Sequence, residues 1–145
     1  MKVLKNFAGG LAGAIALNIL HETVKRYHHD APRVDLVGEE ALTKLAKAAN
    51  VEPPQGDNLY LATLGGDVLS NAFYYSMVGA GNKKYLLLRG AGLGLAAGIG
   101  ALTLTKPLGL RDAPVTRTNK TKILTVAYYL FGGLITAVTL KALRK

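Results

Sequence analysis

Four apolar stretches constrain this 145-residue chain more than any other feature. They run from Phe7 to Leu20, from Leu59 to Ala80, from Tyr85 to Thr105 and from Ile123 to Leu140. A helix needs about 20 apolar residues to cross a bilayer, with a range of about 17–25. Snorkelling lysines lengthen the shorter stretches, and the first continues as a helix to Tyr27. We therefore predict an all-α integral membrane protein, a four-transmembrane-helix bundle with spans at about 3–27, 58–80, 84–105 and 122–142.

The first stretch also has features of a secretory signal. Two lysines precede a short apolar run that contains Ala14-Ile15-Ala16, a triplet of the kind that signal peptidases cut. The apolar run continues past this triplet to Leu20, which favours a retained span.

The segments between the spans differ in length and character. Gly81 to Lys84 makes a tight turn that predicts an antiparallel hairpin of the second and third spans. In the first long loop, residues 38–50 carry apolar side chains at helical spacing, and Pro53-Pro54 follows. We expect an amphipathic helix there, lying on the membrane surface or packed on the protein itself.

Basic residues are divided almost evenly between the two sides of the predicted membrane. Eight of the 18 lie on the side of the termini and ten on the side of the long loops, which leaves a dual-topology protein as an alternative. Eight of the nine acidic residues lie on the loop side, so the terminal side is purely basic. We expect cytoplasmic termini in a plasma or inner membrane. Anionic lipid headgroups account for the net charge of +9, and no nucleic-acid-binding motif is present.

Polar residues at membrane depth mark the predicted binding site. Asp67 begins one stripe at i, i+3, i+4 and i+7 in the second span, and Asn18 begins a similar stripe in the first. The two helices are antiparallel and joined on the loop side, so the stripes share one half of the membrane and can face each other. The predicted site comprises Asp67, Ser70, Asn71, Tyr74, Asn18, His21 and Glu22. It is either a hydrated, ion-responsive site or a hydrogen-bond clamp between helices.

All three histidines of the chain lie close together in sequence. A divalent metal could take its ligands from His21, Glu22, His28, His29 and Asp30. The H-E-x-x-H spacing of zinc proteases is missing, and there is no cysteine, so we predict no cofactor and keep the metal as an alternative.

Glycines recur at four-residue spacing in the spans. Gly9 and Gly13 form one such pair, Gly90, Gly94 and Gly98 form a longer series, and Gly132 and Gly133 lie in the last span. Close helix contact explains this spacing, either within the bundle or between copies of the chain. We expect at least one of these faces to serve self-association.

No phosphate-binding loop, nucleophile elbow or dinucleotide fingerprint is present. These features favour an accessory or scaffolding homo-oligomer without catalytic activity. The alternatives are a small ion- or proton-coupled transporter or channel with its site around Asp67, and a metal-binding membrane protein or enzyme that uses the histidine cluster.

Overall fold

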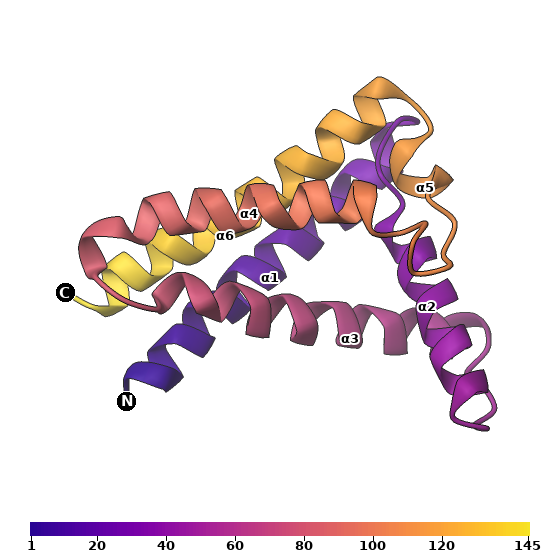
Figure 1. The fold of residues 1–145 in the computed structure, drawn as a ribbon, viewed down its shortest axis with the longest axis horizontal. Helices are drawn as coiled ribbons and strands as arrows, with labels where there is room; N and C mark the ends of the chain where they lie inside the picture. The colour runs from indigo at the N-terminus through magenta and orange to yellow at the C-terminus, as the bar shows by residue number, and fades with distance from the viewer.

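The computed structural model describes residues 1–145 and is entirely helical, which confirms that part of the predicted fold. Its elements are α1 (Lys2–Tyr27), α2 (Val34–Ala48), α3 (Gly56–Ser76), the 3-10 turns η1 (Met77–Gly79) and η2 (Lys83–Tyr85), α4 (Leu86–Thr103), α5 (Ala113–Thr116) and α6 (Asn119–Leu143). The four long helices run between two ends of the molecule. Both termini lie at one of these ends, and α2 and α5 lie at the other (Figure 1).

Three helices are long and apolar enough to cross a membrane by length and composition: α1, α6 and the helical segment Lys83–Thr103 that contains α4. α3 is not among them. It has 21 residues, but Asp67 and Asn71 within it, together with Asp57 and Asn58 in its first turn, lower its hydropathy. The prediction of an all-helical chain is therefore confirmed, with three helices that could span a membrane by length and composition, and the fourth span is a proposal made below.

Glycines bring α4 against α6. A Cβ atom added at Gly94 would lie 2.7 Å from the Tyr129 carbonyl oxygen and 2.8 Å from the Leu130 Cα. Gly90 faces the Gly133 backbone in the same way, and Gly13 places α1 against α6. These glycine faces are occupied within the chain, so self-association, if it occurs, uses other residues.

α3 packs on α1 rather than on the helix that follows it. Gly10 of α1 lies against the α3 backbone at Ala72 and Ser76, and the rings of Phe7 and Phe73 are 5.2 Å apart. The predicted tight turn is present, with Gly81 at a φ of 85°. After it, α4 packs on α6 while α3 packs on α1 and α2. The turn thus joins two helices that pack on different partners.

The hydroxyl groups of two tyrosines in α3 tie it to the rest of the bundle. Tyr75 donates to the Tyr129 carbonyl at 2.7 Å, and Tyr74 donates to the Leu93 carbonyl at 2.8 Å. Tyr75 is fully buried, so its bond joins α3 to α6 through the core.

α2 begins at Val34, four residues before the predicted start at 38. Asp35 lies in its first turn and accepts hydrogen bonds from Arg33, and a carboxylate there is favoured by the helix dipole. α2 ends at Ala48, followed by Asn50 in the left-handed conformation (φ 56°). None of its residues is fully buried, and it lies across the loop end of the molecule, in contact with α3 and α5 (Figure 1).

Candidate functional site

A cavity of about 210 Å³ lies between α1, α2 and α3 at the loop end of the molecule. α1 and α3 form its walls, and α2 covers it. Besides His21 and Tyr60, four ionisable side chains line it, namely Glu22, Lys25, Asp35 and Asp67. Three of these are carboxylates and one is an ammonium, so the lining carries an excess of negative charge when they are ionised.

Asp67 lies at the inner end of this group of residues. Its Oδ2 accepts a hydrogen bond from Asn18 Nδ2 of α1 at 3.0 Å, and its Oδ1 accepts one from Asn71 Nδ2 at 3.0 Å. Both amides are buried, and Asn18 also donates to the Ala14 carbonyl at 3.0 Å. No ion pair of the structure includes Asp67. Two neutral amides therefore hold a carboxylate that has no basic partner.

Lys25 stands between the other two carboxylates. Its Nζ lies 2.7 Å from Glu22 Oε1 and 3.4 Å from Asp35 Oδ2. The Tyr60 hydroxyl is 3.4 Å away, and the same Nζ lies 4.9 Å from the centre of the Tyr60 ring. The positive charge of Lys25 is thus shared by two carboxylates, and nothing in this group neutralises Asp67.

Asp35 stays ionised at neutral pH. Burial raises its pKa, but the hydrogen bond and the charge of Arg33, together with the charge of Lys25, outweigh burial and hold the pKa below its ordinary value. Arg33 reaches Asp35 from outside the cavity with an Nη2–Oδ2 distance of 2.7 Å. The rim of the cavity therefore contains an ion pair between Arg33 and Asp35.

Two lining residues carry buried polar atoms without a hydrogen-bond partner, His21 at Nε2 and Thr63 at Oγ1. The His21 ring lies 4.9 Å from the ring of Tyr128, centre to centre, and is 8% exposed. Buried polar groups in proteins nearly always have a hydrogen-bond partner. Both atoms are closed off from solvent and from the cavity, so they are unpaired polar groups behind its wall.

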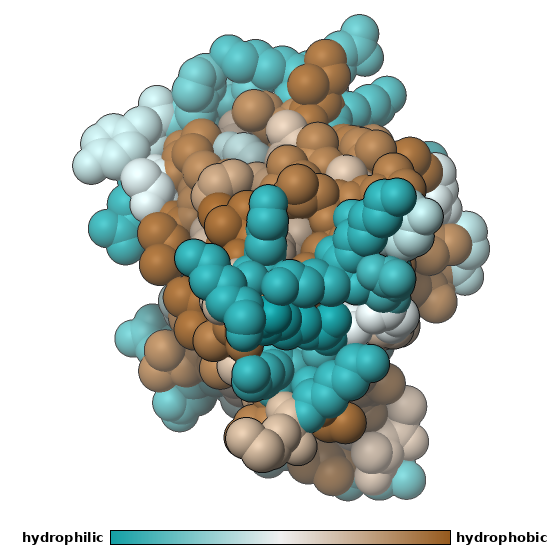
Figure 2. Space-filling view, turned by 90° about the vertical axis from the view of Figure 1, so that its left-hand side faces the viewer, coloured by the Kyte–Doolittle hydropathy of each residue, from teal (hydrophilic) through white to brown (hydrophobic).

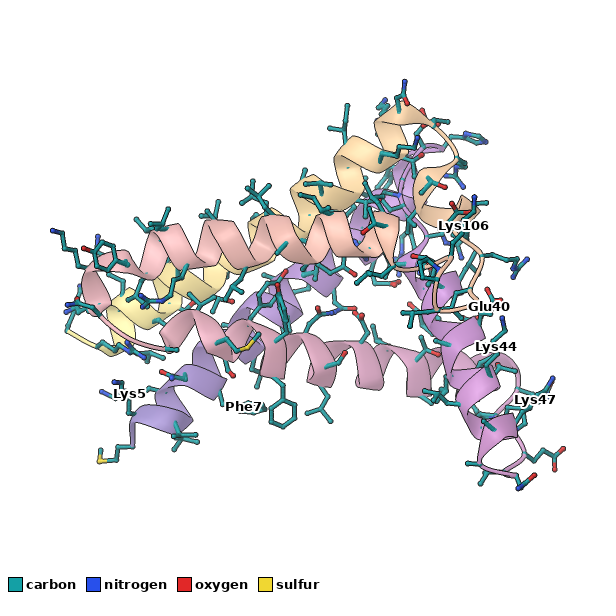
Figure 3. All side chains as sticks on the ribbon, viewed as in Figure 1. Lys5, Phe7, Glu40, Lys44, Lys47 and Lys106 are labelled. Atoms are coloured by element: carbon teal, nitrogen blue, oxygen red, sulfur yellow. The ribbon has the colours of Figure 1, made fainter.

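Charged side chains of α2 contact the segment that follows α4 and hold α2 over the cavity. Glu40 Oε2 accepts a hydrogen bond from the Arg111 backbone N–H at 3.1 Å, and its Oε1 lies 3.0 Å from Lys44 Nζ. Lys44 also donates to the Gly109 carbonyl. The bonds from Lys44 and Arg111 lower the pKa of Glu40 to about 2. Figure 3 shows Glu40 and Lys44 on the side of α2 that faces the segment carrying Lys106.

The structure brings together most of the predicted site. Asn18, His21, Glu22 and Asp67 line the cavity, and Asn71 bonds to Asp67. Two predicted members lie elsewhere. Ser70 donates to the Asp67 backbone carbonyl at 3.2 Å on an exposed surface, because the i+3 position lies about 60° round the helix from Asp67. Tyr74 bonds to α4, as described above.

Tyr60, Thr63 and Asp35 line the cavity but were missed by the sequence prediction. Tyr60 and Thr63 precede Asp67 by seven and four residues, so extending the polar stripe toward the start of α3 would have identified them. No sequence signal identifies Asp35, because it reaches the site through the reversal of the chain after α1.

The predicted metal ligands are not gathered. The structure contains no group of three or more histidine, cysteine, aspartate or glutamate side chains placed to hold one metal ion. α1 ends at Tyr27, so His28 and His29 leave the helix face that carries His21 and Glu22. The His29 side chain is 98% exposed, and its Nδ1 lies 3.8 Å from Asp30 Oδ1.

Comparison of the chain with protein families, with curated proteins and with solved structures gives no match. Its function is therefore inferred from the residues of the cavity.

Proposed function

We propose that this chain is a four-span membrane protein in which α3 is the fourth span beside α1, α4 and α6. A helix of 21 residues is about 31 Å long, which matches the hydrocarbon thickness of a bilayer. Leu61, Leu69 and Phe73 of α3 are each more than half exposed, as expected for side chains in contact with lipid. Thr63 and Asp67 of α3 line the cavity and Asn71 bonds to Asp67, so these polar groups are turned away from lipid.

The orientation that we propose places both termini in the cytoplasm of a cell with a plasma or inner membrane. Lys and Arg are divided almost evenly, eight at this end and ten at the other, so the orientation rests on the absence of acidic residues from the end with the termini. The cavity then opens near the opposite surface, where α2 lies as an interfacial helix.

The function that the cavity supports best is the binding and transport of a small cation. The observation that carries this proposal is the partly buried Asp67 carboxylate, which lines the cavity and has no basic partner. An unpaired carboxylate at membrane depth is costly unless a proton or a cation neutralises it. The excess of carboxylates in the lining favours a cation over an anion as the transported species.

Flux into proteoliposomes tests this proposal. Wild-type protein is expected to carry at least one of Na⁺, K⁺ and tetramethylammonium, and Asp67→Asn is expected to abolish that flux while the protein stays folded. Asp57→Asn is the matched control, because it removes the same charge from the same helix outside the cavity lining. Wild-type protein without flux of any of the three cations, or flux that survives Asp67→Asn, would contradict the proposal.

A non-catalytic accessory role is the second candidate, and the Asn18–Asp67 bond favours it. This bond joins α1 to α3, and membrane bundles use such bonds to hold helices together. In that case Asp67→Asn lowers stability, and neither form of the protein carries an ion. A homo-oligomer would assemble through exposed apolar residues, because the glycine faces are occupied within the chain.

A further inference from the structure

The end of the molecule that holds the termini is a surface of basic side chains without an acidic side chain. It is formed by the start of α1, the turn between α3 and α4, and the end of α6. Its basic residues are Lys2, Lys5, Lys83, Lys84, Arg89, Lys141, Arg144 and Lys145. Figure 2 shows hydrophilic side chains gathered across the middle of this face, with hydrophobic ones around them.

Two open pockets lie side by side on this surface, and Lys83 lines both of them. The first, about 550 Å³, is lined by Lys2, Lys5, Lys83, Arg144 and Lys145, among others. The second, about 380 Å³, is lined by Lys83, Lys84 and Lys141 together with Leu86 and Leu87. Each pocket therefore offers at least three basic side chains, and one lysine lies between them.

These charges are oriented but not neutralised by the chain. Lys5 Nζ donates to the Leu143 carbonyl at 2.8 Å, and Lys83 Nζ donates to the Arg144 carbonyl at 2.8 Å. Arg144 donates to the Asn6 side chain and to the Gly79 carbonyl. None of the ion pairs of the structure lies at this end. Carbonyl oxygens accept hydrogen bonds without cancelling the charge, so the surface attracts anions.

We infer that this surface binds the headgroup of a phospholipid that carries two phosphates, one in each pocket with Lys83 between them. Basic pockets at the ends of transmembrane helices favour such headgroups. A lipid fits better than a soluble phosphate because apolar side chains adjoin the charges. Leu87 lines the second pocket and is 47% exposed, and Val3, Leu4 and Leu88 are more exposed still. They are placed to contact the acyl chains below the headgroup.

The test is binding of defined lipids to the purified chain in mild detergent, measured by native mass spectrometry and by thermal unfolding. Cardiolipin, with two phosphates, is compared with phosphatidylglycerol at equal total phosphate and with phosphatidylcholine. The expected order of affinity is cardiolipin, then phosphatidylglycerol, then phosphatidylcholine. Equal affinity for cardiolipin and phosphatidylglycerol would overturn the assignment of a two-phosphate site.

Two variants locate the site. Lys83→Gln is expected to weaken cardiolipin binding about fivefold, the contribution of one lysine near an anionic lipid surface. Lys141→Gln, which removes a lysine that makes no hydrogen bond within the chain, is expected to weaken binding similarly without disturbing the fold. Lys47→Gln on α2 removes the same charge at the opposite end and should leave binding unchanged. If Lys47→Gln weakens binding as much as the other two changes, the attraction is a general effect of net charge and the site is refuted.

Pyrophosphate distinguishes a lipid from a soluble ligand. It carries two phosphates without acyl chains, so it is expected to compete poorly with cardiolipin. Competition at concentrations similar to those of cardiolipin would overturn the lipid assignment.

Discussion

Replacing Gly94 by alanine should weaken the contact of α4 with α6, whereas the same change at Gly92 should not. A Cβ at Gly94 would meet backbone atoms of Tyr129 and Leu130 at 2.7 and 2.8 Å, and backbone cannot rotate away as a side chain can. At Gly92 an added Cβ meets nothing within 4 Å. Replacing glycine by alanine within a helix raises the free energy of unfolding by about 0.5–1 kcal/mol at either position. Overpacking lowers it by about 1–3 kcal/mol.

The difference between the two variants isolates the packing contribution, because the gain in helix propensity is common to both. Gly94→Ala is expected to be about 1–3 kcal/mol less stable than Gly92→Ala, measured by unfolding in mixed micelles with increasing sodium dodecyl sulfate. Equal stability of the two variants would refute the packing of α4 on α6. If Gly94→Ala dissociated an oligomer without a change in unfolding, the glycine face would instead serve self-association, as expected at first from the sequence.

Two further contacts give predictions of their own. Tyr75→Phe removes the donor to the Tyr129 carbonyl and is expected to lower the free energy of unfolding by about 0.6–1.7 kcal/mol in the same micelle assay; an unchanged free energy would show that this bond contributes nothing. The pKa of Glu40 is lowered to about 2 from an ordinary 4.5, so its contribution to holding α2 is complete above about pH 4.5 and is lost as the pH falls toward 2. The distribution of distances between a spin label on α2 and one on the segment at 104–112 should broaden in the wild-type protein as the pH falls over that range. In Glu40→Gln it should be broad at every pH. A wild-type distribution that stays unchanged down to pH 2 would contradict this role of Glu40.

Hydropathy and helical periodicity predicted the parts of this fold that depend on local sequence. The long helix α1 continues past its apolar stretch to Tyr27, as its polar stripe indicated. The stripes that begin at Asn18 and Asp67 do face each other, because two antiparallel helices joined at one end place those residues at the same depth.

The features that the sequence did not predict depend on which helices pack on each other in the folded chain. Periodicity shows which residues share a helix face but not which helix lies opposite. The turn at Gly81 therefore predicted a hairpin, although α3 packs on α1 and α4 on α6. Asp35 enters the cavity only because the chain reverses after α1 and α2 packs on α3, and nothing in its local sequence indicates this.

The measurement that tests the central claim most directly is cation-dependent stabilisation of the purified protein. Thermal unfolding is followed in detergent with increasing Na⁺, K⁺ or tetramethylammonium at fixed ionic strength. A cation that occupies the cavity at 100 times its dissociation constant stabilises the wild-type protein by about 2.7 kcal/mol. The account predicts this stabilisation by at least one of the cations in the wild-type protein and in Asp57→Asn, and its loss in Asp67→Asn. A wild-type protein that none of the cations stabilises, or equal stabilisation of Asp67→Asn, would contradict it.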